Sequence, residues 1–133
     1  MNPRYALVAL RAAHRCEYCH APEAIFNLPF EVEHITPLAQ AGVDTAANWA
    51  LACRACNLRK AAHLTGVDPE SQSAVQLFNP RADRWAEHFR ADLETGEIIG
   101  LSPCGRATVT RMAMNSESQT VARHQWILLG LFP

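Results

Sequence analysis

The spacing of apolar and polar positions predicts a helix near the N-terminus and another in residues 54–63. Asn2 is a good N-cap and Pro3 suits the first helical position, and the alanine-rich apolar stripe that follows predicts a helix to about Ala13. From Asn48 the composition becomes helical, and residues 54–63 contain no glycine, proline or β-branched residue. We therefore expect the second helix over 54–63.

The segment between these helices carries the pattern of a hairpin. Two short apolar runs in residues 25–35, interrupted at 27–29, predict an irregular hairpin. Gly42 and Asp44 then mark a loop or turn. Beyond the second helix, residues 66–80 begin and end with turn-forming residues and predict a polar connection.

The C-terminal half predicts a second hairpin followed by helices. Residues 85–93 and 97–101 flank Glu94-Thr95-Gly96, which is a turn signal. Two helical stretches follow, over 107–114 and, after a serine suited to the N-cap position, over 117–129. The predicted fold class is α+β.

Length and composition favour one folded domain over residues 1–133. Of the 133 residues, 49% are apolar and 19% are charged, which argues against a disordered or fibrous chain. No apolar run approaches the length of a membrane span, so no membrane is expected as a partner. The N-terminus lacks the apolar run of a secretory signal, and a cytoplasmic location is the expectation.

The charge balance gives no long-range attraction for nucleic acid. The formal net charge is −1, so any basic surface must be local. Residues 1–63 hold six Lys and Arg against five Asp and Glu, whereas residues 64–133 hold six against eight. Phosphate contacts are therefore expected in the first segment.

Four of the five cysteines form two CxxC pairs, Cys16 with Cys19 and Cys53 with Cys56. Each pair places two thiolates on one tight turn, as a tetrahedral zinc site requires, and two pairs complete a closed site. Structural zinc contributes roughly 10–16 kcal/mol of apparent binding energy to folding. The sequence thus predicts a structural zinc ion, while Cys104 is expected to be a small buried residue.

Cys16 to His20 also spell CxxCH, the attachment signature of c-type haem. This alternative ranks below zinc, because haem attachment normally accompanies export and would leave the second CxxC pair without a purpose.

The residues between and after the cysteines resemble the HNH endonuclease family. The shared order is a CxxC pair, an acidic residue joined to His, a Pro, a Gly-containing loop, an Asn, and a second CxxC pair followed by Asn and Lys. The similarity covers about residues 11–63. Apart from the cysteines, the matching residues are Glu33, His34, Pro37, Gly42, Asn48, Asn57 and Lys60.

This resemblance implies a ββα-metal fold that cleaves DNA with one divalent cation, Mg²⁺ or another such as Mn²⁺ or Ni²⁺. By the resemblance, His34 is the general base that activates water. Glu33 and Asn57 provide the protein oxygen ligands of the cation. Asn48 ties the loop in place and orients the His.

The same resemblance places cationic side chains near the phosphate. Arg59 and Lys60 are candidates for charge stabilisation, and with Arg54 for nucleic-acid binding. Two residues depart from the common pattern, since Glu33 stands where Asp is commoner and Asn57 stands in place of His. His63 is left out because it lies on a different helical face from Asn57.

Residues 76–133 look like the C-terminal extension of small bacterial HNH proteins. We expect its hairpin and helices to cover the nuclease core; the alternative is that Arg106, Arg111 and Arg123 grip DNA. The sequence is compatible with two functions. One is metal-dependent hydrolysis of DNA phosphodiesters, and the other is a non-catalytic zinc-ribbon module that binds nucleic acid or a protein partner. The sequence does not indicate the oligomeric state.

Overall fold

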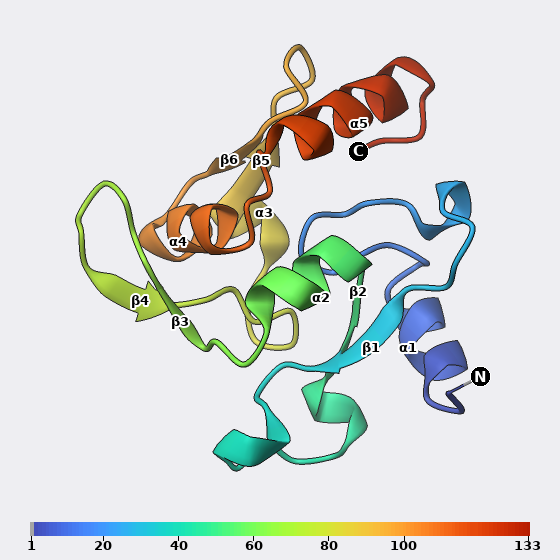
Figure 1. The fold of residues 1–133 in the computed structure, drawn as a ribbon, viewed down its shortest axis with the longest axis vertical. Helices are drawn as coiled ribbons and strands as arrows, with labels where there is room; N and C mark the ends of the chain where they lie inside the picture. The colour runs from blue at the N-terminus through green and yellow to red at the C-terminus, as the bar shows by residue number, and fades with distance from the viewer. Residues whose placement is uncertain (1) are drawn as a thin grey trace.

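The computed structural model describes residues 2–133, which form a small mixed α/β structure (Figure 1). The helices, 3-10 turns and strands are, in chain order, α1 (Tyr5–Arg11), η1 (Glu23–Ile25), β1 (Glu31–His34), η2 (Leu38–Gln40), η3 (Ala46–Asn48), β2 (Trp49–Ala52), α2 (Arg54–Lys60), β3 (Thr65–Val67), β4 (Ala74–Gln76), α3 (Trp85–His88), β5 (Phe89–Ala91), β6 (Ile98–Gly100), α4 (Pro103–Arg111) and α5 (Glu117–Leu128).

Strands β1 and β2 pair antiparallel, with Glu31 opposite Ala52 and His34 opposite Trp49. The expected hairpin within residues 25–35 is therefore wrong, because β1 pairs across a long loop. The expectation of helical structure from Asn48 onward is also wrong for residues 49–52, which form strand β2. Its alanines are good helix formers, yet they are fully buried between packed elements, and burial outweighs propensity.

Helix α2 confirms the second predicted helix, although it ends at Lys60. Cys53 is its N-cap, and its Sγ accepts a hydrogen bond from the Cys56 backbone N at 3.5 Å. The next residue, Ala61, has φ 48°, which terminates the helix. In Figure 1, α2 lies between the β1–β2 pair and the C-terminal elements.

The second half contains two hairpins. The β3–β4 hairpin lies in the segment expected to be a polar connection. The β5–β6 hairpin confirms the turn at 94–96, where Gly96 has φ +79° and packs closely on the backbone of α5. Residues Trp85–His88 form the short helix α3 in place of strand.

Helix α4 begins four residues before the expected start. Ser102 caps it by accepting a hydrogen bond from the Gly105 backbone N at 3.0 Å, and Pro103 occupies its first turn. Helix α5 follows Ser116 as expected. Arg106 of α4 makes two bonds to the buried Asp68 carboxylate, at 2.9 and 3.0 Å, which ties α4 to the β3–β4 hairpin.

Buried apolar side chains from both halves form one cluster. It includes Tyr18 and Leu51 from the first half and Phe89 and Met114 from the second. Trp85 adds a polar link, donating from Nε1 to the Tyr18 carbonyl oxygen at 2.8 Å. The C-terminal half thus packs directly on the segment that holds the first cysteine pair. None of the helices within residues 2–133 has the length and apolar character needed to span a bilayer.

Candidate functional site

The two CxxC pairs converge on one point. Cys16 and Cys19 lie in the loop after α1, while Cys53 and Cys56 lie at the start of α2. All four side chains are buried, and their Sγ atoms lie within 4.8 Å of one another. The Cys19 and Cys53 sulfurs are 3.8 Å apart, close to the ~3.8 Å that tetrahedral coordination with Zn–S bonds of about 2.3 Å requires.

The clustered thiols shift the pKa values of Cys19, Cys53 and Cys56 in opposite directions. Hydrogen bonds from Cys16, Cys19 and Cys56 lower the pKa of Cys53, so one thiolate is favoured within the cluster. The same network and burial raise the pKa of Cys19 and Cys56. The donor set and the burial fit structural zinc, whose charge would hold all four groups as thiolates.

Arg123 of α5 brings a buried positive charge toward this cluster. Its side chain is fully buried, and its Nη atoms donate to the carbonyl oxygens of Gly96 at 2.7 Å and Met114 at 2.9 Å. Its Nε has no hydrogen-bond partner among the described residues. Burial lowers the pKa of Arg123, and the four cysteines act in the opposite direction. Arg123 is therefore buried against backbone carbonyl oxygens and is in no position to contact DNA.

A second group of predicted residues lines an open hollow of about 330 Å³. Glu33 and His34 come from the end of β1, and Asn57 comes from the middle of α2. Because α2 packs against β1, residues more than twenty positions apart share this hollow. Its lining consists of Val32, Glu33, His34, Pro37, Leu38, Asn57, Ala61 and Ala62.

The Glu33 carboxylate is buried beneath the hollow. It accepts hydrogen bonds from the Tyr18 hydroxyl and, at 3.1 Å, from Lys60 Nζ. Burial raises the pKa of Glu33, and the Lys60 charge opposes that shift. Each carboxylate oxygen keeps a second lone pair that can accept a further contact.

Lys60, whose side chain is expected to contact phosphate, is buried. Its side chain is only 2% exposed. Besides Glu33, its ammonium donates to the carbonyl oxygens of His34 at 3.4 Å and Ile35 at 2.8 Å. The reason is position: the last turn of α2 lies over the end of β1, where buried oxygens need a donor. Lys60 therefore joins α2 to β1.

The His34 imidazole is held by a residue that the sequence did not single out for chemistry. His34 Nε2 lies 2.8 Å from Asp44 Oδ1, which leaves Nδ1 available. Asp44 also accepts from Trp49 Nε1 at 3.1 Å and from both Nη atoms of Arg4 at 2.6 Å. The hydrogen bond from His34, followed by that from Trp49, lowers the pKa of Asp44 to about 2.

Asn48 ties the loop that carries Asp44. Its Oδ1 accepts from the Thr36 backbone N, and its Nδ2 donates to the carbonyl oxygens of Thr36 and Val43, all at 2.8 Å. Only the tertiary arrangement brings Asp44 to His34, since an Asp two residues after a Gly in a loop is typical of a turn.

The remaining predicted residues lie on or near α2. The Asn57 carboxamide donates from Nδ2 to Glu31, and Asn57 lines the hollow. Arg54 is exposed and pairs with Glu31 at 3.0 Å. Arg59 donates to the carbonyl oxygens of Met112 and Ala113, at 3.3 and 2.9 Å, and so contacts the C-terminal half. Of the three expected nucleic-acid contacts, Arg54 alone is exposed.

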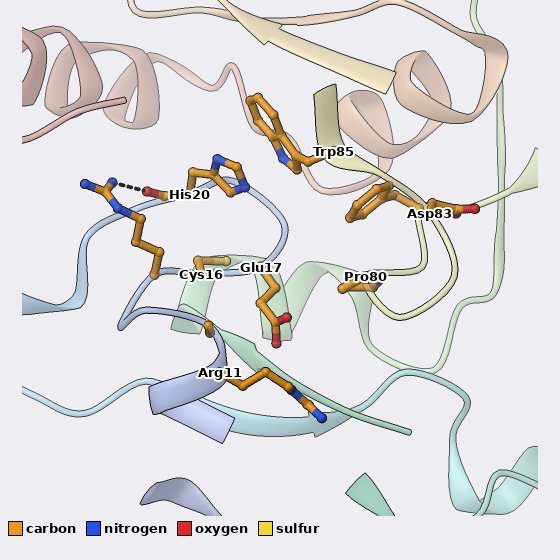
Figure 2. A pocket seen from close by; sticks show the side chains of 10 residues that line it. Arg11, Cys16, Glu17, His20, Pro80, Asp83 and Trp85 are labelled. Atoms are coloured by element: carbon orange, nitrogen blue, oxygen red, sulfur yellow. Dashed lines mark hydrogen bonds between the residues drawn. The ribbon is translucent and has the colours of Figure 1, made fainter. Parts of the chain in front are cut away.

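A separate cavity of about 320 Å³ borders the cysteine cluster (Figure 2). Within it, His20 stacks on Trp85 with ring centroids 3.9 Å apart. Burial lowers the pKa of His20 to about 4. Because Cys16 and Cys19 point to the second cysteine pair and His20 packs on an indole, the structure supports the zinc interpretation over haem attachment.

Comparison with known families gives one match, to the family model described as HNH endonuclease, over residues 16–63. Neither the curated proteins nor the solved structures gave a match. The matched segment begins at the first cysteine and contains both CxxC pairs, the β1–β2 pair, α2 and the hollow. Residues 16–63, called the HNH segment below, are therefore similar to the HNH endonuclease family.

Proposed function

We propose that this protein is a metal-dependent endonuclease that hydrolyses DNA phosphodiester bonds at the hollow formed by Glu33, His34 and Asn57. The observation that carries the proposal is their common lining of one open site within the HNH segment. The hollow is open at the surface, which suits an extended phosphodiester backbone better than an enclosed small ligand.

His34 takes the proton from the attacking water. With Nε2–H donating to the Asp44 carboxylate, Nδ1 carries a lone pair that can accept this proton. Asp44 keeps that tautomer and stabilises the imidazolium that forms. Asn48 acts indirectly: it donates to the Val43 carbonyl oxygen and so holds the loop on which Asp44 lies.

Glu33 and Asn57 are the proposed protein ligands of the catalytic cation. A carboxylate oxygen and a carboxamide oxygen are ligands that hard divalent cations accept, and two ligands leave positions for water and phosphate oxygens. When bound, such a cation neutralises charge that develops on the phosphate. Mg²⁺, Mn²⁺ and Ni²⁺ are the candidates.

The zinc-bound cysteines are proposed as the scaffold of a ββα-metal unit made by β1, β2 and α2. They fix the start of α2 against the loop that follows α1, and so place Asn57 opposite Glu33. Arg54 is the proposed DNA contact. Its exposed guanidinium pairs with Glu31, which precedes Val32 of the hollow along β1.

The test is plasmid nicking in Mg²⁺, Mn²⁺ or Ni²⁺ by zinc-loaded wild type, His34→Ala and Glu33→Gln. His63→Ala, which changes an exposed histidine, is the control. Removal of the base should slow cleavage by about 10²-fold or more, and loss of the carboxylate should raise the cation concentration required. Equal nicking by all four proteins would exclude the catalytic assignment.

One observation favours the alternative, a zinc module that binds nucleic acid without cutting it. The Glu33 carboxylate is already bonded to Tyr18 and Lys60, as a structural carboxylate would be. The alternative predicts that zinc-loaded wild type shifts the anisotropy of labelled DNA yet nicks no plasmid in any of the three cations.

A further inference from the structure

Three potential metal ligands meet outside the HNH segment. Asp83 precedes α3, His88 ends α3, and Cys104 lies in the first turn of α4. One ligand atom from each residue lies within 4.8 Å of the other two. The sequence suggested no role for this trio, because its members are separated along the chain and Cys104 has no CxxC partner.

The neighbours of these residues orient them without using all their ligand atoms. Ser102 Oγ lies 2.6 Å from His88 Nδ1, which leaves Nε2 for another partner. Asp83 Oδ2 accepts from the Asn79 backbone N at 3.0 Å, which leaves Oδ1. A second partner that fixes the ring is the usual surrounding of a metal-bound histidine.

We propose that Asp83, His88 and Cys104 form a second metal site, selective for a borderline-soft divalent ion such as Zn²⁺. An oxygen, a nitrogen and a sulfur ligand from three elements match the ligand types of zinc, and three protein ligands leave a fourth position open. The thiolate and the imidazole disfavour Mg²⁺ and Ca²⁺, which take oxygen ligands.

Without a cation, burial and the Asp83 carboxylate disfavour the Cys104 thiolate. Burial and the neighbouring Asp83 carboxylate raise the pKa of the Cys104 thiol. A bound cation would remove the cause of that repulsion and would bind the thiolate directly. The Asp83 carboxylate and the half-buried Cys104 thiolate can therefore both be ionised when a divalent ion lies between them.

The site is distinct from the two already described. It shares no residue with the four-cysteine cluster or with the hollow at His34. Figure 2 shows Asp83 at the edge of the cavity beside the cysteines, with its carboxylate directed away from His20 and Trp85. A metal here would connect the loop before α3, the end of α3 and the start of α4.

The experiment uses Co²⁺ as the probe, added to zinc-loaded protein after excess metal is removed. A cobalt–thiolate bond gives a charge-transfer absorption, whereas Co²⁺ bound at the hollow has only oxygen and nitrogen ligands. We expect one equivalent of Co²⁺ to produce this absorption in wild type. Cys104→Ser should abolish it, and His88→Gln should weaken Co²⁺ binding by about tenfold or more. His63→Gln, outside every cluster, is the matched control.

Two spectroscopic results would overturn the proposal. One is the absence of charge-transfer absorption in wild type. The other is its persistence in Cys104→Ser, with release of zinc to a chromophoric chelator, which means that cobalt has entered the four-cysteine cluster. Asp83→Asn provides a second variant in case serine disturbs α4, and circular dichroism checks the fold. An unchanged dissociation constant in folded Asp83→Asn and His88→Gln proteins also contradicts the site.

Discussion

At the scale of single residues, the orientation of the His34 ring is the feature on which the proposed chemistry depends. Asp44 holds that ring at 2.8 Å and is itself held by Arg4 and Trp49. A carboxylate with three donors around it stays ionised, and its pKa of about 2 agrees. The imidazole therefore has a fixed acceptor at Nε2 and keeps Nδ1 for substrate.

Replacement of Asp44 by Asn should slow the turnover of DNA with little change in KM. The amide of Asn can donate to Nε2 and so favour the tautomer in which Nδ1 carries the proton. We expect a loss in kcat that approaches, without exceeding, the ~10²-fold or larger loss of His34→Ala. The measurement is the kinetics of plasmid nicking.

Asp44→Glu, which restores an acceptor, should recover part of the rate. A change in KM with kcat intact would show that Asp44 serves DNA binding, and the positioning role would then be wrong.

At the scale of elements, α2 is too short to be stable alone. It has seven residues, well below the ~12–15 that an isolated helix needs in water. Its start is fixed by Cys53 and Cys56, and its end by Lys60, which bonds to Glu33 and to two carbonyl oxygens of β1 and its continuation. Between these anchors lies Asn57. The helix is therefore ordered by tertiary contacts at both ends.

Lys60→Met should destabilise the protein rather than weaken DNA binding directly. Removing one member of a buried ion pair costs about 3–5 kcal/mol because the other charge remains buried. Urea unfolding of the zinc-loaded variant measures the loss, with Arg54→Met as the exposed control. If Lys60→Met keeps wild-type stability and loses affinity for DNA, the lysine contacts phosphate and the role inferred from its burial is incorrect.

At the scale of the whole molecule, the sulfur cluster links the two halves. Arg123 of α5, whose pKa burial lowers and the cysteines raise, is buried without a carboxylate partner among the described residues. A buried cation needs compensating charge, and zinc held by four thiolates supplies a net negative one. The α5 segment should therefore depend on zinc, although it lies outside residues 16–63.

Removal of zinc by a chelator should raise hydrogen exchange in α5 as well as in α2. Arg123→Met should release zinc faster than wild type, because a buried cation near the thiolates is lost. Arg111→Met, a basic residue of α4, serves as the control. Unchanged protection of α5 after zinc loss would show that the two halves are stabilised independently.

Cys53→Ser should fail to fold at all, because zinc binding supplies folding energy.

Local pattern was sufficient for the cysteine pairs, for α2 and α5, and for the turn at 94–96. Each of these depends on residues close in sequence: CxxC spacing, helix-forming composition, and a glycine at positive φ. The family resemblance also came from the order of residues along one segment. Residue order alone thus established the candidate zinc site and the list of candidate catalytic residues.

Tertiary structure alone decided which of those residues meet and what each contacts. The pairing of β1 with β2, the burial of Lys60 and Arg123, and the His34–Asp44 bond all join positions at least ten residues apart. Local secondary-structure propensity does not predict such contacts, because their free energy comes from burial and from pairing of desolvated charges. For this reason alanine-rich β2 is a strand, and Lys60, the last residue of α2, is buried.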